Sequence, residues 1–196
     1  MEFVSMKGYG KYLGFSLVKV HGKVKVKDFL DEVKVPPESL VVQLLDPRAI
    51  AGWNHLYHGV RLCLKAFRRR RLISKNLQVE LILYLAARRQ IDESIKILGV
   101  KENTRTVLIL MLGDSKEEMT KYMEELISKL GKEVSTELIG GEGIADPTYI
   151  AQVYSISGQE LDSTYPYPYL GSGPSRVMSR LEKLVVERIV LFASSL

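Results

Sequence analysis

The stretch SLVVQLLDPRAIAGWNHLYHGVRLCLKAFRRRR, residues 39–71, joins a mostly apolar segment to a long amphipathic one. Residues 39–45 have the length and composition typical of a buried strand. Asp46 is then a good N-cap, and Pro47 suits the first helical position, where its missing N–H costs no hydrogen bond. We therefore predict a helix from Pro47 to about Arg70. A strand that leads directly into such a helix favours a fold built from both kinds of element.

The predicted helix has two chemically different sides. At 100° per residue its apolar side carries Trp53, Leu56, Tyr57, Val60, Cys63, Leu64 and Phe67. Its polar side carries Asn54, His58, Arg61, Lys65 and Arg68. We expect the apolar side to pack against the rest of the protein and the polar side to remain accessible.

Apolar runs and capping residues predict the other elements of the chain. Strands are expected over residues 12–20, 104–112 and 188–193. Helices are expected near 27–33, over 76–89, over 90–98, from Ser115 to just before Gly131, from Asp146, and over 176–187. We predict an α+β fold with a small mixed or antiparallel sheet covered by helices. The chain is expected to form a single domain over residues 1–196, in which the Tyr/Pro/Gly-rich residues 163–175 are a surface loop.

Motifs of enzymes, metals and cofactors are missing from the sequence. Cys63 is the only cysteine, so an intrachain disulfide and a multi-cysteine metal site are both excluded. His55 and His58 are three residues apart, but no third ligand or HExxH pattern accompanies them. We predict a protein that is not an enzyme, with no catalytic residue, no metal and no cofactor. An unrecognised enzyme is the alternative, which a deep pocket with perturbed titratable groups would support.

Two features of the sequence bear on its compartment. The first 18 residues lack the basic-then-apolar order of a secretory signal. The longest uninterrupted apolar runs, LILYLAA and VLILML, are too short to span a bilayer. We therefore expect a cytoplasmic protein that does not enter a membrane.

The formal net charge of +5 is concentrated in one segment. Ten of the 28 Lys and Arg residues lie between Pro47 and Arg89, where Glu80 is the only acid, and the rest of the chain is slightly acidic. One interpretation is a solvated helix end, because each cation at a helix C-terminus contributes about 0.3–1 kcal/mol through the helix dipole. That effect explains one or two arginines. Four adjacent ones repel each other and favour a polyanionic ligand.

A phosphate backbone is the commonest ligand for such a surface, because every Lys or Arg contact releases a condensed counterion. Arginine also stacks on bases, which favours unpaired strands over duplex. Neither a helix-turn-helix nor an RNP or zinc-finger pattern is present. We predict that RNA is contacted by Lys65, Arg68, Arg69, Arg70, Arg71, Lys75, Arg88 and Arg89.

The stretch NLQVELILYLAARRQIDESIKILGV, residues 76–100, resembles the signature of the smallest KEOPS subunit family, the Cgi/TPRKB family, which includes the PRPK-binding protein and its archaeal Cgi relatives. The matching positions are Asn76, Leu77, Glu80, the LYL of residues 83–85, Arg89-Gln90-Ile91 and Gly99-Val100. DPRAIAGWNHLYHG resembles the family's long helix, and VERIVLFA its closing segment. The chain departs from the pattern at Ser94 and near Ala86-Ala87, and residues 163–175 are longer than usual.

The resemblance implies a non-catalytic accessory subunit of the KEOPS complex, which installs threonylcarbamoyladenosine on tRNA. It implies two partners, the small atypical kinase of that complex and the single-stranded 3′ CCA end of tRNA. The family's basic RNA surface includes the Arg of Arg-Gln-Ile, which corresponds to Arg89. We expect a monomer outside the complex.

The alternative is a protein–protein module that regulates the kinase without binding RNA. A kinase-binding face could use the apolar stripe Leu181, Leu184 and Val185, although their periodicity is also typical of core residues.

Overall fold

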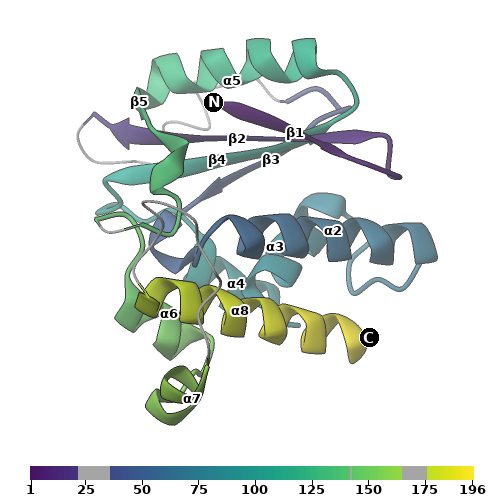
Figure 1. Cartoon of the computed structure of the whole chain (residues 1–196). Coiled ribbons are helices and arrows are strands. Elements are labelled where there is room, and N and C mark those ends of the chain that lie inside the picture. The colour runs from purple at the N-terminus through teal and green to yellow at the C-terminus, as the bar shows by residue number, and fades with distance from the viewer. Residues whose placement is uncertain (22–35, 142, 165–175) are drawn as a thin grey trace. The chain divides into compact units, whose positions relative to one another are not determined.

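The computed structural model describes residues 1–21, 36–141, 143–164 and 176–196 (Figure 1). The chain forms two compact units, and each consists of two separate segments. The first unit contains Met1–Asp46 and Gly99–Glu137, and the second contains Pro47–Leu98 and Leu138–Leu196. The predicted α+β class is confirmed, because the strands lie in the first unit and most helices in the second. The single domain over 1–196 stays a prediction.

The first unit is built on an antiparallel sheet. Its strands are β1 (Glu2–Met6), β2 (Lys11–Val20), β3 (Val41–Leu45), β4 (Thr106–Gly113) and β5 (Gly131–Val134). The order is β1-β2-β4-β3, and β5 pairs with the second half of β2. The predicted strands over 12–20, 39–45 and 104–112 are confirmed as β2, β3 and β4. The strands β1 and β5 were not predicted from the sequence.

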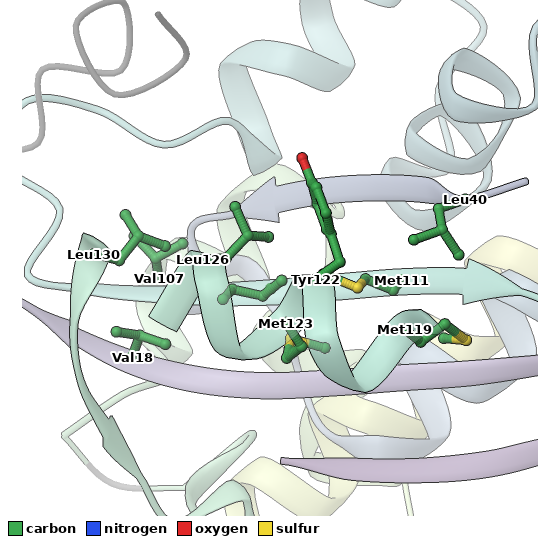
Figure 2. Close-up of a cluster of buried hydrophobic side chains, with 10 residues drawn as sticks. Val18, Leu40, Val107, Met111, Met119, Tyr122, Met123, Leu126 and Leu130 are labelled. Atoms are coloured by element: carbon green, nitrogen blue, oxygen red, sulfur yellow. The ribbon is translucent and has the colours of Figure 1, made fainter. Parts of the chain in front are cut away.

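One helix covers a face of this sheet (Figures 1 and 2). It is α5 (Lys116–Leu130), whose N-cap Ser115 accepts a hydrogen bond from the backbone N–H of Glu118, as the sequence predicted. Its buried side chains follow the helical period and pack on the sheet residues Val18, Val107, Ile109 and Met111; they are Met119, Tyr122, Met123, Leu126 and Leu130. Full burial of each such side chain contributes about 1.5–3 kcal/mol. A hydrophobic core of this unit therefore lies between α5 and the sheet.

The second unit is helical. Its elements are the 3-10 turn η1 (Pro47–Ala49) and the helices α2 (Trp53–Arg69), α3 (Leu77–Ala86), α4 (Ile91–Leu98), α6 (Pro147–Val153), α7 (Gly158–Ser163) and α8 (Arg176–Ser194). A further 3-10 turn, η2 (Thr136–Leu138), stands where the chain passes from one unit to the other. The predicted helix start at Asp146 is confirmed, since its side chain accepts a hydrogen bond from the first turn of α6. The helix predicted to start near Asn76 is α3, and the Asn76 side chain is its N-cap. The α2 helix packs against both α3 and α8.

The predicted helix start at Pro47 was wrong by six residues. Asp46 is buried and its carboxylate accepts a hydrogen bond from the Thr104 hydroxyl, while Pro47 opens only a 3-10 turn. The α2 helix begins at Trp53 with Gly52 as its N-cap, which has no side chain to accept a hydrogen bond. Glu182 of α8 supplies the acceptor, at 2.7 Å from the Asn54 nitrogen. This cap comes from a distant part of the sequence, so local pattern could not reveal it.

The predicted strand over 188–193 was also wrong, because these residues continue α8 to Ser194. Within this run Ile189 and Phe192 are buried, whereas Val190 and Leu191 are 43% and 55% exposed. This three-residue spacing is helical, and the apolar composition of the run had indicated a strand. The predicted helix near 27–33 and nearly all of the predicted loop over 163–175 lie outside the described residues, although Ser163 itself ends α7.

Candidate functional site

The four consecutive arginines stand where α2 ends. Arg70 adopts a left-handed conformation (φ 54°), and its N–H bonds the carbonyl of Phe67 while the N–H of Arg71 bonds that of Ala66. This pair of hydrogen bonds ends the helix and turns the chain away from its axis. Arg68, Arg69, Arg70 and Arg71 are all exposed. The turn therefore spreads the cations over the last turn of α2 and the loop that follows.

Three of the predicted cations line one pocket of the helical unit. The pocket has a volume of about 260 Å³ and is bounded by α2, α3, the α2–α3 loop and the C-terminal end of α8. Its cationic wall consists of Lys65, Arg69 and Arg71. Its apolar wall consists of Leu62, Ala66, Val190 and Ala193. The end of α8 lies at the same end of the helical unit as the α2–α3 loop (Figure 1). We call this site the basic pocket.

Carboxylates do not neutralise the cationic wall of the basic pocket. Within the described parts of the chain, Lys65, Arg69 and Arg71 form no ion pair. Glu80 is fully buried, and its two oxygens accept from the backbone nitrogens of Ile73 and Ser74 at 3.3 and 2.8 Å. The only acid of the basic segment thus binds the backbone.

Tyr84 of α3 is a buried residue that lines the basic pocket. Its side chain is 1% exposed, lines the pocket, and packs edge-on against Phe192 with 5.2 Å between ring centroids. Burial, and after it the charge of Glu80, raise the pKa of Tyr84 to about 12. The phenol is therefore neutral at physiological pH, where it has an O–H to donate. Sequence reasoning missed this residue because its position in the apolar run 81–86 is typical of core.

The second arginine pair divides into one internal and one exposed side chain. Arg88 donates to the carbonyls of Ala87 and Val153 and lies 4.0 Å from the carboxylate of Glu93. Arg89 is exposed and donates to the backbone oxygen of Ser195 at 2.6 Å. Because Ser194 and Leu196 line the basic pocket, Arg89 lies beside the same end of α8.

The eight predicted cations therefore fall into three groups. Lys65, Arg69 and Arg71 line the pocket, and Arg89 is bonded to the residue between two pocket-lining positions. Arg70 and Lys75 are exposed on the α2–α3 loop, and Arg68 is exposed on α2. Arg88 is half-buried and engaged in the contacts described above. The geometry brings the first group and Arg89 together more closely than the others.

One of the two histidines of α2 is buried inside the protein. His55 is fully buried, accepts from the backbone N–H of Ala51 at Nδ1 and donates to the carbonyl of Leu85 from Nε2. Burial lowers the pKa of His55 to about 4, so the ring is neutral at physiological pH. In the described parts of the chain no three His, Cys, Asp or Glu residues are arranged to hold a metal ion. No described helix is long and apolar enough to cross a bilayer.

The apolar stripe Leu181, Leu184 and Val185 belongs to the core of the helical unit. These side chains are 1%, 5% and 0% exposed and pack with Ile150, Tyr154 and Ile189. They are thus covered within the chain itself, and their role in partner binding stays a prediction. Exposed apolar residues lie elsewhere, among them Ile91 and Ile95 of α4, which are 43% and 51% exposed.

A comparison with known families matches the sequence over most of its length. The sequence model of the family named Kinase binding protein CGI-121 matches residues 24–192. The chain belongs to the CGI-121 family. No curated protein matches the chain at a significant level.

Membership of the CGI-121 family confirms the resemblance to the Cgi/TPRKB proteins that the motif over 76–100 indicated. The description of CGI-121 proteins is that they bind a kinase, which is an accessory role. The basic pocket and the exposed apolar residues of α4 both lie within the matched range, apart from the last residues of α8.

Proposed function

We propose that this CGI-121 protein is a non-catalytic accessory subunit of the KEOPS tRNA threonylcarbamoyladenosine-modification complex. It binds the small atypical kinase of that complex and recruits tRNA through its single-stranded 3′ CCA end. It works in the cytoplasm and is a monomer outside the complex. The observation that carries the RNA part of the proposal is the basic pocket, where Lys65, Arg69 and Arg71 face an apolar wall.

The composition of the basic pocket suits the end of an unpaired strand. Cations that lack a carboxylate partner can bind RNA phosphates, and this releases the counterions that were condensed on the RNA. The apolar wall offers contact to a base that has left its stack. The volume, about 260 Å³, lies just below the range of about 300–1,000 Å³ for pockets that hold drug-sized ligands. One terminal nucleotide fits these dimensions better than a duplex groove does.

The alternative function is kinase binding without RNA. In either case, exposed apolar residues on α4 indicate a kinase-binding surface that is separate from the basic pocket. Ile91 and Ile95 are one helical turn apart and therefore share a face of α4. Exposed apolar pairs of this kind serve as anchors in helix-mediated interfaces. We propose that this face of α4 contacts the kinase. In Ile95→Glu, kinase capture should fall while tRNA affinity stays at the wild-type value; equal kinase capture would remove α4 from the interface.

The deciding experiment is tRNA binding by fluorescence anisotropy at two salt concentrations. The Arg69→Glu/Arg71→Glu variant should lose most of the affinity, and the wild-type affinity should fall steeply as salt rises. Lys121→Glu is the single-charge control, since Lys121 is an exposed cation of α5 in the other unit. Removal of the CCA end from the tRNA should weaken binding by the wild type. If wild-type protein does not bind tRNA, the kinase-only alternative holds. If wild type and double variant bind tRNA equally, RNA contacts the protein outside the basic pocket.

A further inference from the structure

Glu80 occupies an unusual electrostatic position. It is the only acid between Pro47 and Arg89, yet in the part of the chain that the structure describes it forms no ion pair with any of the ten cations there. Its side chain is fully buried in the first turn of α3. A buried carboxylate is costly to retain unless hydrogen bonds compensate for its lost hydration. Its partners therefore indicate what it does.

The partners of Glu80 lie in the loop that connects α2 to α3. Oε1 accepts from the backbone N–H of Ile73 at 3.3 Å, and Oε2 accepts from that of Ser74 at 2.8 Å. The start of this loop is held by the hydrogen bond from Arg71 to Ala66 that ends α2. One carboxylate thus fixes the second half of the loop, and the end of α2 fixes the first half.

The same carboxylate also lies beside the wall of the basic pocket. Tyr84 follows Glu80 by one helical turn on α3, and Tyr84 lines the pocket. After burial, the charge of Glu80 also contributes to the raised pKa of Tyr84. Glu80 therefore bonds the loop that carries Arg71 and lies one helical turn from Tyr84, which lines the pocket.

We propose that Glu80 is a positioning residue of the basic pocket: its buried carboxylate fixes the backbone of Ile73 and Ser74, and this holds Arg71 at the pocket wall. The inference rests on the proposed RNA-binding function and deepens it. The proposal predicts that loss of the Glu80 charge weakens tRNA binding, whereas electrostatics alone predicts that it strengthens tRNA binding. Neutralising the only acid of a cationic site should strengthen polyanion binding, whereas losing the loop anchor should weaken it.

The test is Glu80→Gln in the full chain. The amide keeps the size of the side chain, but its NH₂ group cannot accept a hydrogen bond, so one of the two backbone N–H groups loses its partner. We expect tRNA affinity to fall about fivefold, which corresponds to ~1 kcal/mol. We also expect the amide hydrogens of Ile73 and Ser74 to exchange faster with solvent in the RNA-free protein. Unchanged or higher tRNA affinity in a folded variant would overturn the proposal.

A double-mutant cycle shows whether Glu80 acts through Arg71. If it does, Glu80→Gln weakens binding much less in an Arg71→Gln background than in the wild type. Additive effects would mean that Glu80 does not act through Arg71, which would also overturn the proposal.

The matched control is Glu182→Gln, which alters another buried carboxylate that bonds backbone. Glu182 is 1% exposed and bonds Asn54 at the opposite end of α2, which is about 25 Å long. This variant should lower the free energy of unfolding and leave tRNA affinity unchanged. If both variants reduce affinity equally, the effect of Glu80 is general destabilisation and the positioning role is excluded.

Wild-type tRNA binding tests the proposed function, and the amide exchange of Ile73 and Ser74 tests the positioning role of Glu80. If wild-type protein fails to bind tRNA, the proposed function is wrong whatever Glu80 does. If wild-type protein binds tRNA but the exchange of Ile73 and Ser74 is the same in Glu80→Gln, only the positioning role fails.

Discussion

Arg89 donates a hydrogen bond of 2.6 Å to the backbone oxygen of Ser195 and a longer one of 3.3 Å to its hydroxyl. This contact joins the start of α4 to the end of α8, although the two residues are far apart in sequence. Ser195 lies between Ser194 and Leu196, which both line the basic pocket. The motif arginine is thereby placed next to the cations of α2.

Arg89→Glu should weaken tRNA binding and leave the fold intact. The side chain is exposed, so its hydrogen bonds compete with water and their loss should change the free energy of unfolding by less than ~1.5 kcal/mol. Anisotropy titrations should show a clear loss of affinity and a weaker salt dependence, because one phosphate contact is replaced by a repulsion. Urea denaturation checks the fold. A variant that keeps both the affinity and the salt dependence of the wild type would place Arg89 outside the RNA surface.

Gly52→Ala should destabilise the protein through the cap of α2. A Cβ atom at this position would lie 2.3 Å from Oε1 of Glu182, so either the helix start or the carboxylate must move. We expect a loss of about 1–3 kcal/mol in the free energy of unfolding. Gly158→Ala is the control, because a Cβ there meets nothing within 4 Å at the first position of α7. If the two alanine variants are equally stable, the close approach of Gly52 and Glu182 does not contribute to the free energy of unfolding.

Acid should destabilise the protein through His55. Its pKa is about 4 in the folded state against ~6.5 for an unperturbed histidine, so between these values the unfolded chain binds a proton that the folded chain does not. The free energy of unfolding therefore falls as pH is lowered from about 6.5 to 4, by up to roughly 3 kcal/mol from this group. Burial also lowers the pKa of His58, which acts in the same direction.

The measurement for His55 is the free energy of unfolding by urea at several pH values. His55→Gln should reduce the slope of that free energy against pH in this window, whatever its effect on absolute stability. His21→Gln changes an exposed ring and should leave the slope unaltered. A wild-type slope that persists in His55→Gln would assign the acid sensitivity to other groups.

Arg70→Gly should stabilise the protein. Arg70 has φ 54°, a left-handed conformation that disfavours residues with a side chain and that glycine adopts freely. We expect the melting temperature to rise and the free energy of unfolding to increase by ~1 kcal/mol. Arg69→Gly removes the same charge from the last helical residue of α2, where glycine should lower stability instead. Equal effects of the two substitutions would show that charge, and not backbone conformation, dominates here.

Much of the fold follows from local sequence. The apolar runs of β2, β3 and β4, the N-caps Ser115 and Asp146 and the helix start near Asn76 could all be predicted, because each depends on residues close together in the chain. The end of α8 was misread because IVLF suits a buried strand as well as a helix, and burial alone distinguishes them. β5 was missed because a strand of four residues, GKEV, gains its pairing from β2 rather than from its own composition.

The cations of the candidate site could be predicted from the sequence, but the way they combine with other residues into a pocket could not. The sequence placed Lys65, Arg69 and Arg71 on or after one helix, and they do share a pocket. The other walls come from Tyr84 and from the end of α8, and tertiary packing alone brings these beside α2. Glu80 was counted as one negative charge among ten positive ones, whereas its hydrogen bonds to Ile73 and Ser74 depend on the path of the loop.

The interleaving of the two units has a consequence for the order of folding during synthesis. β3 leaves the ribosome before residues 47–98, whereas β4, which lies between β2 and β3, leaves after them. Until β4 arrives, the β1–β2 hairpin and β3 lack the neighbour that joins them. Translation adds roughly 5–20 residues per second, so these edges stay open for seconds. All residues of α2, α3 and α4 have been synthesised by then, so these helices can form before the sheet is complete.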